Sequence, residues 1–158
     1  VTDSGAPMGL VYPDGRPTRQ LQAMGEAFGW IQRQRAILAP LAPAAPGEQP
    51  KLPDPFASGN VASILVHPTN GRRYLMVVAN HSPLRQPGAP DTPASARPSA
   101  QGAAQARIAV PVLLGPGVTR LTRLDGPGDQ PLSRGDGGMR TSVSLAPGSA
   151  ALFAIEGR

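Results

Sequence analysis

The first third of the chain has an apolar pattern with the period of a helix. Between residues 18 and 38, apolar side chains recur at spacings of three and four, while the arginines fall outside this stripe. The stripe consists of Leu21, Met24, Phe28 and Ile31. We therefore predict an amphipathic helix over residues 18–38, capped by the Thr18 hydroxyl and ended before Pro40. Because only one side of this helix is apolar, the four residues are its predicted packing face.

The second half of the chain has the shorter period and the turn signals of β structure. Residues 61–67 and 72–80 are rich in β-forming side chains, and the Asn70-Gly71 pair between them suits a hairpin turn. Four more apolar segments follow, each bounded by glycine-rich or proline-rich turns: 107–114, 118–124, 139–146 and 149–155. Six short strands with such breaks predict an antiparallel β-sandwich. A shorter apolar run at 7–12 predicts one strand before the helix.

Two segments without strand or helix signals divide the chain. Residues 39–60 are rich in proline, which favours an extended connector over helix or central strand. Residues 82–105 almost lack bulky apolar side chains and are predicted to be a long loop or a disordered insertion. The predicted fold class is thus mainly β. A small antiparallel β-sandwich over residues 61–158 is preceded by one long amphipathic α-helix, within residues 1–38, and by the proline-rich connector.

The composition limits how large the core can be. Of 158 residues, only three are Phe, two Tyr and one Trp, while glycine and proline contribute 19 and 20. Aromatic side chains normally dominate core energetics, so the core must rest mainly on Val, Leu, Ile and Ala. One small core with long loops fits these numbers better than a compact globule of the whole length.

The charge and the missing cysteines exclude several classes of partner and site. The net charge of +5 comes from arginines that are scattered along the chain rather than gathered into an arm or stripe, so we predict no nucleic-acid partner. No apolar run approaches the roughly 20 residues of a membrane helix, and we predict no membrane partner. With no cysteine in the chain, disulfides and thiolate metal sites are excluded.

The polar residues give no pattern for catalysis or for metal binding. Glycosidases need two carboxylates across one bond, but six aspartates here stand next to glycine or proline and are read as turn residues: Asp14, Asp54, Asp91, Asp125, Asp129 and Asp136. Asp3 and Asp14 alone could lie at the end of a barrel strand. His67 and His81 flank the predicted hairpin without a third ligand at metal spacing. We predict no catalytic residue, no cofactor and no metal ion.

Three local features have ordinary explanations. Arg134-Gly135-Asp136 spells an integrin-binding tripeptide, but it lies in a glycine-rich stretch that predicts a turn. Residues 155–158 spell a protease recognition sequence, which is either the remnant of an engineered tag or the natural end of the last strand. The chain opens on Val1, and we expect it to be part of a longer polypeptide.

Two groups of segments together resemble one family. GLVYPDGRPTRQLQAMGEAFGWI (9–31) resembles the final strand, turn and helix of the (β/α)8 barrel in bacterial glycoside hydrolases of the beta-galactosidase kind. The segments YLMVVANHS (74–82), VTRLTRLDGPGDQPL (118–132) and VSLAPGSAALFAIEG (143–157) resemble the small C-terminal sandwich of such enzymes. The order of helix, connector, hairpin and sandwich is also similar.

The resemblance implies a non-catalytic role for this chain. In that family the catalytic carboxylates lie on earlier barrel strands, and no residue here matches them. Residues 1–38 would then be the closing strand and helix of an upstream barrel, which is the implied partner, in the same polypeptide or in another subunit. The implied function is a structural accessory β-domain of a secreted bacterial glycoside hydrolase-like protein, extracellular or periplasmic.

Two other interpretations stay open. A self-assembling extracellular fibre or surface subunit could use residues 39–58 to pair with a neighbour's sheet edge, and homo-oligomers are compatible with either function. A carbohydrate-binding module is less favoured, because sugar platforms need exposed aromatic side chains. Only Trp30, Phe56 and Tyr74 could serve in that way.

Overall fold

A computed structural model of the chain describes residues 19–53, 59–79 and 107–157. The chain divides into two compact units, one ending at Ala39 and the other beginning at Pro40, and each is described by itself. Several predictions lie outside the described residues: the strand at 7–12, the Thr18 cap and the insertion at 82–105.

The first unit contains one helix, α1 (Arg19–Leu38), at nearly the predicted bounds. Its last turn carries Arg35, a favourable charge near the carbonyl end of a helix dipole. The Ala39 N–H still donates to the Arg35 carbonyl at 2.9 Å, and the helix ends there, before Pro40. The long helix predicted from the sequence is confirmed.

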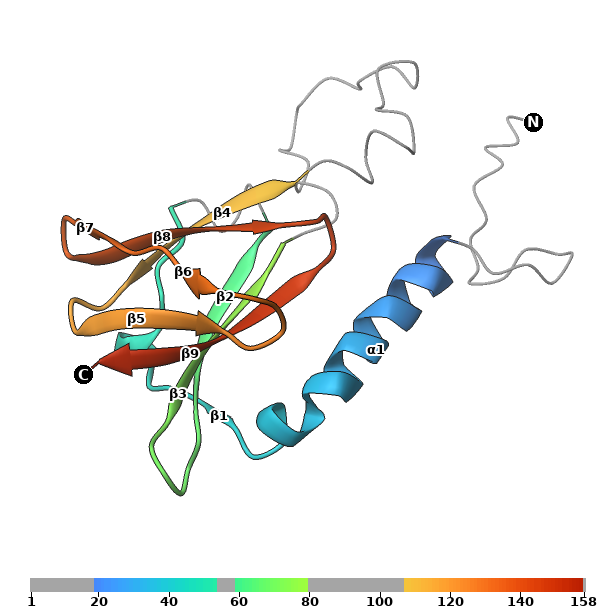
Figure 1. Cartoon of the computed structure of the whole chain (residues 1–158), viewed down its shortest axis with the longest axis horizontal. Coiled ribbons are helices and arrows are strands. Elements are labelled where there is room, and N and C mark those ends of the chain that lie inside the picture. The colour runs from blue at the N-terminus through green and yellow to red at the C-terminus, as the bar shows by residue number, and fades with distance from the viewer. Residues whose placement is uncertain (1–18, 54–58, 80–106, 158) are drawn as a thin grey trace, which may run out of the picture. The chain divides into compact units, whose positions relative to one another are not determined.

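The second unit is mainly β, and its larger sheet has six antiparallel strands (Figure 1). The strand order is β1-β2-β3-β9-β5-β6. Their bounds are β1 (Ala42–Pro43), β2 (Val61–Val66), β3 (Arg73–Val78), β9 (Ala150–Gly157), β5 (Val118–Arg123) and β6 (Asp129–Gln130). The β2–β3 hairpin turns at Asn70-Gly71, where Gly71 takes a φ of 68° and the Asn70 side chain accepts from the Arg72 N–H.

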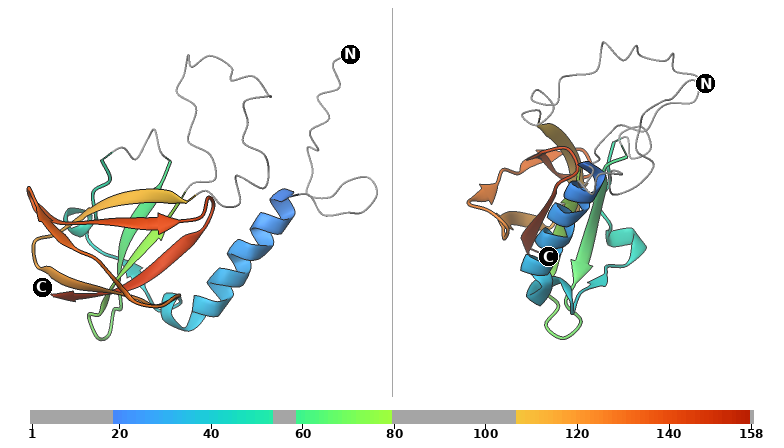
Figure 2. Two further views of the ribbon diagram at one scale, coloured as in Figure 1. Left: turned by 45° about the horizontal axis from the view of Figure 1, so that its top comes forward. Right: turned by 90° about the vertical axis from the view of Figure 1, so that its right-hand side faces the viewer.

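The smaller sheet has three antiparallel strands in the order β4-β8-β7. These are β4 (Ile108–Leu114), β8 (Gly138–Leu145) and β7 (Ser133–Gly135), with Asp136-Gly137 forming the β7–β8 turn. Figure 2 shows the two sheets facing each other from two further directions. The predicted antiparallel β-sandwich is therefore confirmed, with the short strands β1, β6 and β7 added to the six that the sequence predicts.

The core lies between the two sheets and is built almost wholly from aliphatic side chains, as the composition requires. Its fully buried members include Ile64, Leu75, Val77, Leu121, Val110, Val143, Leu145 and Phe153. Phe153 of β9 is the largest of them. Each buried methylene stabilises the fold by roughly 0.8 kcal/mol, so these side chains supply most of the driving force for folding.

The proline-rich connector is part of the sandwich over residues 40–53. It adds β1 to the edge of β2 and contains a short 3-10 helix, η1 (Pro46–Glu48). Further along, Lys51 and Leu113 of β4 exchange two backbone hydrogen bonds, at 2.9 and 2.8 Å. One extended segment thus binds the edge strand of each sheet, which a proline-rich sequence can do because only alternate residues need to donate.

Between these two contacts, the side chain of Gln49 makes the hydrogen bonds that a neighbouring strand would make. Its side-chain amide donates to the carbonyls of Ala44 and Ile64, at 2.8 and 3.1 Å, and accepts from the Ile64 N–H at 2.9 Å. The same oxygen accepts from the Ser63 hydroxyl at 3.2 Å. The amide therefore satisfies the outward backbone groups of Ile64 as a neighbouring strand would.

The outer edge of β4, which binds the connector at Leu113, is also protected from pairing with another strand by its own sequence. Since Leu113 directs its backbone N–H and carbonyl toward Lys51, Pro111 faces the same edge two residues earlier. Proline has no N–H to offer to another strand, and edge strands commonly carry it for that reason. The sequence predicted a strand here despite Pro111, and its edge position explains why the proline is tolerated.

Candidate functional site

The predicted packing face of the helix lies on α1. Met24, Phe28 and Ile31 are exposed, with Phe28 60% exposed, and Leu21 is half-buried. A stripe of this kind on a helix normally covers another apolar surface. The four residues are one candidate docking surface, and the identity of what they bind stays a prediction.

A second apolar surface, which the sequence analysis did not identify, lies on the six-stranded sheet. Ala151 and Phe153 of β9 point into the core, so Leu152 between them points to the opposite face of the sheet. Leu152 has no exposed surface even so, and its ladder partner Met76 is half-buried. This outer face is apolar where a sheet of an isolated domain is usually polar.

The residues of the outer face form three cross-strand rows over β2, β3 and β9. One row has Leu65, Tyr74 and Ala154, the next Ser63, Met76 and Leu152, and the third Val61, Val78 and Ala150. Val61 is the most open of them, with 52% of its surface exposed. A continuous apolar run, as in residues 74–79 and 150–155, is typical of strands buried on both faces, and this was the signal in the sequence.

The outer face becomes polar at β5 and β6. Arg120 donates from Nε and Nη2 to the same Asp129 carboxylate oxygen, at 2.9 and 2.8 Å, and the Thr122 hydroxyl donates to the other oxygen at 3.1 Å. The hydrogen bond from Arg120 lowers the pKa of Asp129, and the same bond raises the pKa of Arg120. Asp129 is therefore an ion-pair partner, and its carboxylate marks the border of the apolar surface.

Asp125 has a structural contact that its turn position did not predict. Its side chain is only 5% exposed, and Oδ1 accepts from the Leu152 backbone N–H at 3.3 Å and from Arg123 Nε at 3.1 Å. The Arg123 guanidinium in turn lies 6.0 Å from the centre of the Phe153 ring. This carboxylate stabilises the junction of β5 and β9, where the backbone of Leu152 needs an acceptor.

The other predicted polar features lie in turns or outside the described residues. Nδ1 of His67 accepts from the Thr69 N–H at 3.3 Å, which fits a strand-end residue. Arg134 and Gly135 end β7, and Asp136 lies in the turn that follows. Asp3, Asp14, Asp54, His81 and Asp91 are not among the described residues, and neither is Phe56, one of the aromatic side chains considered for sugar binding.

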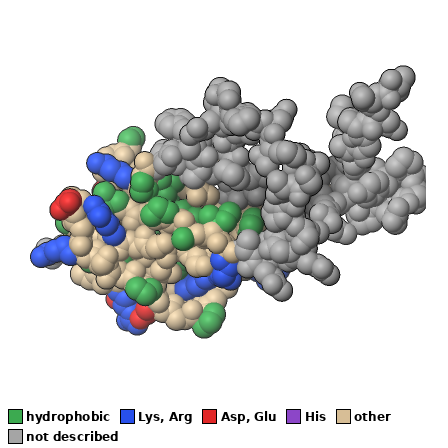
Figure 3. Space-filling view, turned by 90° about the horizontal axis from the view of Figure 1, so that it is seen from above, with side chains coloured by type: hydrophobic (Ala, Val, Ile, Leu, Met, Phe, Trp, Pro, Cys, Tyr) green, Lys and Arg blue, Asp and Glu red, His purple; other side chains and the backbone are tan. Residues whose placement is uncertain are grey.

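Charged side chains and metal ligands do not gather in the described part of the chain. On the face seen in Figure 3, Lys and Arg side chains are spread among side chains of other kinds. Over residues 19–53, 59–79 and 107–157, no three His, Cys, Asp or Glu side chains lie close enough to hold a metal ion. Among these same residues, no helix has both the length and the hydropathy to span a membrane.

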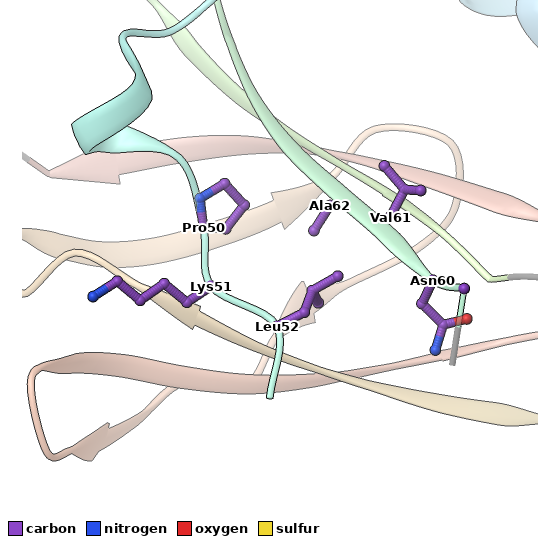
Figure 4. A pocket seen from close by; sticks show the side chains of 7 residues that line it. Pro50, Lys51, Leu52, Asn60, Val61 and Ala62 are labelled. Carbon is purple, nitrogen blue, oxygen red and sulfur yellow. The ribbon is translucent and has the colours of Figure 1, made fainter. Parts of the chain in front are cut away.

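The sandwich has a shallow groove between the connector and β2 (Figure 4). Pro50, Lys51 and Leu52 line one side of it, and Asn60, Val61 and Ala62 line the other. No carboxylate or imidazole is among these lining residues, and Lys51 is their one titratable side chain.

No protein-family model, no curated protein and no solved structure matches this chain. The resemblance drawn from its sequence segments therefore stays a prediction, and the class of fold, a small β-sandwich with a preceding helix, rests on the structure itself.

Proposed function

We propose that this chain is a non-catalytic accessory β-domain of a secreted, glycoside hydrolase-like protein, extracellular or periplasmic, with a (β/α)8 barrel as its docking partner. The main support is the apolar outer face of the six-stranded sheet, where Val61 is 52% exposed and Met76 and Val78 are half-buried at positions that are usually polar. An exposed apolar patch of this kind commonly marks a surface that binds another protein. The exposed stripe of α1 supports the same requirement for a partner.

Three of the described carboxylates of the second unit favour a structural role. Asp125 stabilises the β5–β9 junction, Asp129 binds Arg120, and Glu48 binds Arg73. A glycosidase needs one carboxyl kept protonated and a second one held across the scissile bond from it. The three carboxylates instead bind partners at separate places in the sandwich.

Self-assembly through the connector is the less favoured function. That interpretation needs the extended connector to offer backbone donors and acceptors to a neighbouring chain. Ala44 and Lys51 already bind β2 and β4 of their own sandwich, and Gln49 fills the gap between them. Concentration-dependent polymerisation of the purified chain would restore this alternative.

The proposal is tested first by activity and by the upstream reading frame. The purified chain is expected to show no turnover on a panel of aryl glycosides, and the upstream frame is expected to encode a barrel of about 300 residues with two strand-end carboxylates. Turnover that co-purifies with the folded chain, or an upstream frame without a barrel, contradicts the proposal.

The docking surfaces are tested by adding a charge to each. Val61→Glu on the sheet and Phe28→Glu on α1 are expected to weaken association with the barrel domain at least tenfold, because a carboxylate would be buried against apolar surface. Ser142→Glu, an exposed residue on the smaller sheet, is the matched control and should bind as wild type. Equal binding by all three variants, measured by titration calorimetry, would show that neither surface docks.

A further inference from the structure

Arg73 is an arginine at a core-facing position. It begins β3, where it pairs with Val66 and Ile155, and it alternates with the buried residues Leu75 and Val77. Its side chain therefore points between the two sheets at one end of the sandwich. A charged group in such a position needs polar partners, because loss of water without them is unfavourable.

A pocket lies at this end of the sandwich beside Arg73. It has a volume of about 310 Å³, and apolar side chains that include Ile64, Val118 and Ile155 form part of its lining. Glu48 and Lys51 of the connector supply a carboxylate and a second cation. Pockets that bind small organic molecules combine an apolar lining with a few polar groups, and their volumes begin at about 300 Å³.

The hydrogen bonds of Arg73 are incomplete. Its Nη2 donates to Glu48 Oε2 at 3.3 Å, while its Nε is buried and has no hydrogen-bond partner. These two nitrogens form one edge of the guanidinium, and that edge matches the two oxygens of a single carboxylate. The Glu48 side chain, which is 51% exposed, occupies only half of the edge.

We propose that this pocket binds a small organic carboxylate, which displaces Glu48 and accepts from Nε and Nη2 of Arg73 together. Lys51 gives the site a second positive charge, and the apolar lining accommodates the carbon skeleton of the ligand. The buried Nε–H then gains the acceptor that it lacks. The lining of this pocket shares no residue with either docking surface, so the site adds a binding activity to the proposed function and does not depend on it.

The test compares D-glucuronate with D-glucose, which differ at the carboxylate. Binding to the full chain is followed by backbone amide NMR shifts, and we expect glucuronate to bind at least tenfold more tightly than glucose. Arg73→Met should weaken glucuronate binding roughly tenfold or more, as expected when charge-assisted hydrogen bonds are lost. Arg72→Met, one residue earlier and exposed, is the matched control and should bind as wild type.

Two further variants keep the test valid even if Arg73→Met fails to fold. Glu48→Gln removes the competing charge from an exposed position and is expected to tighten glucuronate binding severalfold. Arg73→Lys retains the charge without the two-nitrogen edge and should bind weakly. Equal binding of glucuronate and glucose, equal binding of glucuronate and sulfate, or no gain in Glu48→Gln would each overturn the proposal.

Discussion

The outward faces of the two sheets of the sandwich differ in polarity. In β8 of the smaller sheet, Val143 and Leu145 are buried while Ser142 and Ser144 are exposed. In β9 of the larger sheet, Phe153 is buried on one face and Leu152 on the other. The alternating pattern of β8 is typical of a strand with water on one face, and the continuous pattern of β9 is typical of a strand with apolar surroundings on both faces. The larger sheet is therefore the central layer of its natural assembly in our proposal.

The core side of β9 gives the largest expected effect and sets the scale. Phe153→Ala should lower the free energy of unfolding by about 3–5 kcal/mol, because it leaves a large cavity between the sheets. Small domains are stable by only about 5–15 kcal/mol, so the variant would be marginal. Urea denaturation followed by circular dichroism measures the loss. A change below about 1 kcal/mol would mean that Phe153 is not central to the core.

The outer side of the same strand provides the direct comparison. Leu152→Ala is expected to cost about 2–5 kcal/mol, the range for buried leucines, although the residue faces away from the core. Ser142→Ala, at an outward position of β8, should change stability by less than about 0.5 kcal/mol. Equal, small effects of the two substitutions in urea denaturation would show that the two outer faces do not differ.

Most elements of the fold have a periodic pattern of apolar residues, and the sequence predicts those elements. Elements without such a pattern could not be predicted from it. Strands such as β8 and the helix α1 repeat their pattern over many residues, so they were predicted close to their bounds. The two-residue strands β1 and β6 are too short to show a period. They form because distant segments lie beside them, and that information is absent from the local sequence.

The candidate surfaces divide in the same way. The stripe of α1 was visible because four residues share one helical period. The outer sheet face was missed because a continuous apolar run predicts a strand but does not say which side is the core. The pocket beside Arg73 could not be predicted either, since Glu48 and Arg73 meet only through the path of the connector.

The connector gives the next smaller effect. Gln49→Ala should lower stability by about 1–3 kcal/mol, because the Ile64 N–H loses its acceptor at a partly buried edge of the larger sheet. Gln49→Glu keeps an acceptor for the Ile64 N–H and loses the two hydrogen bonds that the Gln49 amide donates. The Ile64 amide should therefore stay better protected from hydrogen exchange in Gln49→Glu than in Gln49→Ala. Hydrogen exchange of the Ile64 amide measures this directly. Equal protection of that amide in wild type and Gln49→Ala would show that the Gln49 side chain does not bind the Ile64 N–H.

The polar border of the outer face gives the smallest effect, and its dependence on pH is the useful quantity. The hydrogen bond from Arg120 holds the pKa of Asp129 below its ordinary value in the folded chain. An unfolded Asp titrates near about pH 4, so the folded state is favoured above that pH and loses the contribution as the pH falls through the lowered pKa. The difference in Tm between wild type and Asp129→Asn should thus be positive at neutral pH and vanish in acid.

Further substitutions and a change of salt concentration separate this ion pair from a general effect of charge. Arg120→Gln should remove the same pH-dependent difference as Asp129→Asn, and the double variant should add little, because both substitutions break one interaction. Glu156→Gln should have less effect at neutral pH, since its carboxylate lies 3.9 Å from Arg120 and not in hydrogen-bond contact. Because both partners are exposed, 1 M salt should reduce the difference as well. If the Tm difference between wild type and Asp129→Asn persisted at low pH, the effect of Asp129 would come from packing at the border and not from its charge. The apolar face would then extend across the sheet beyond β9.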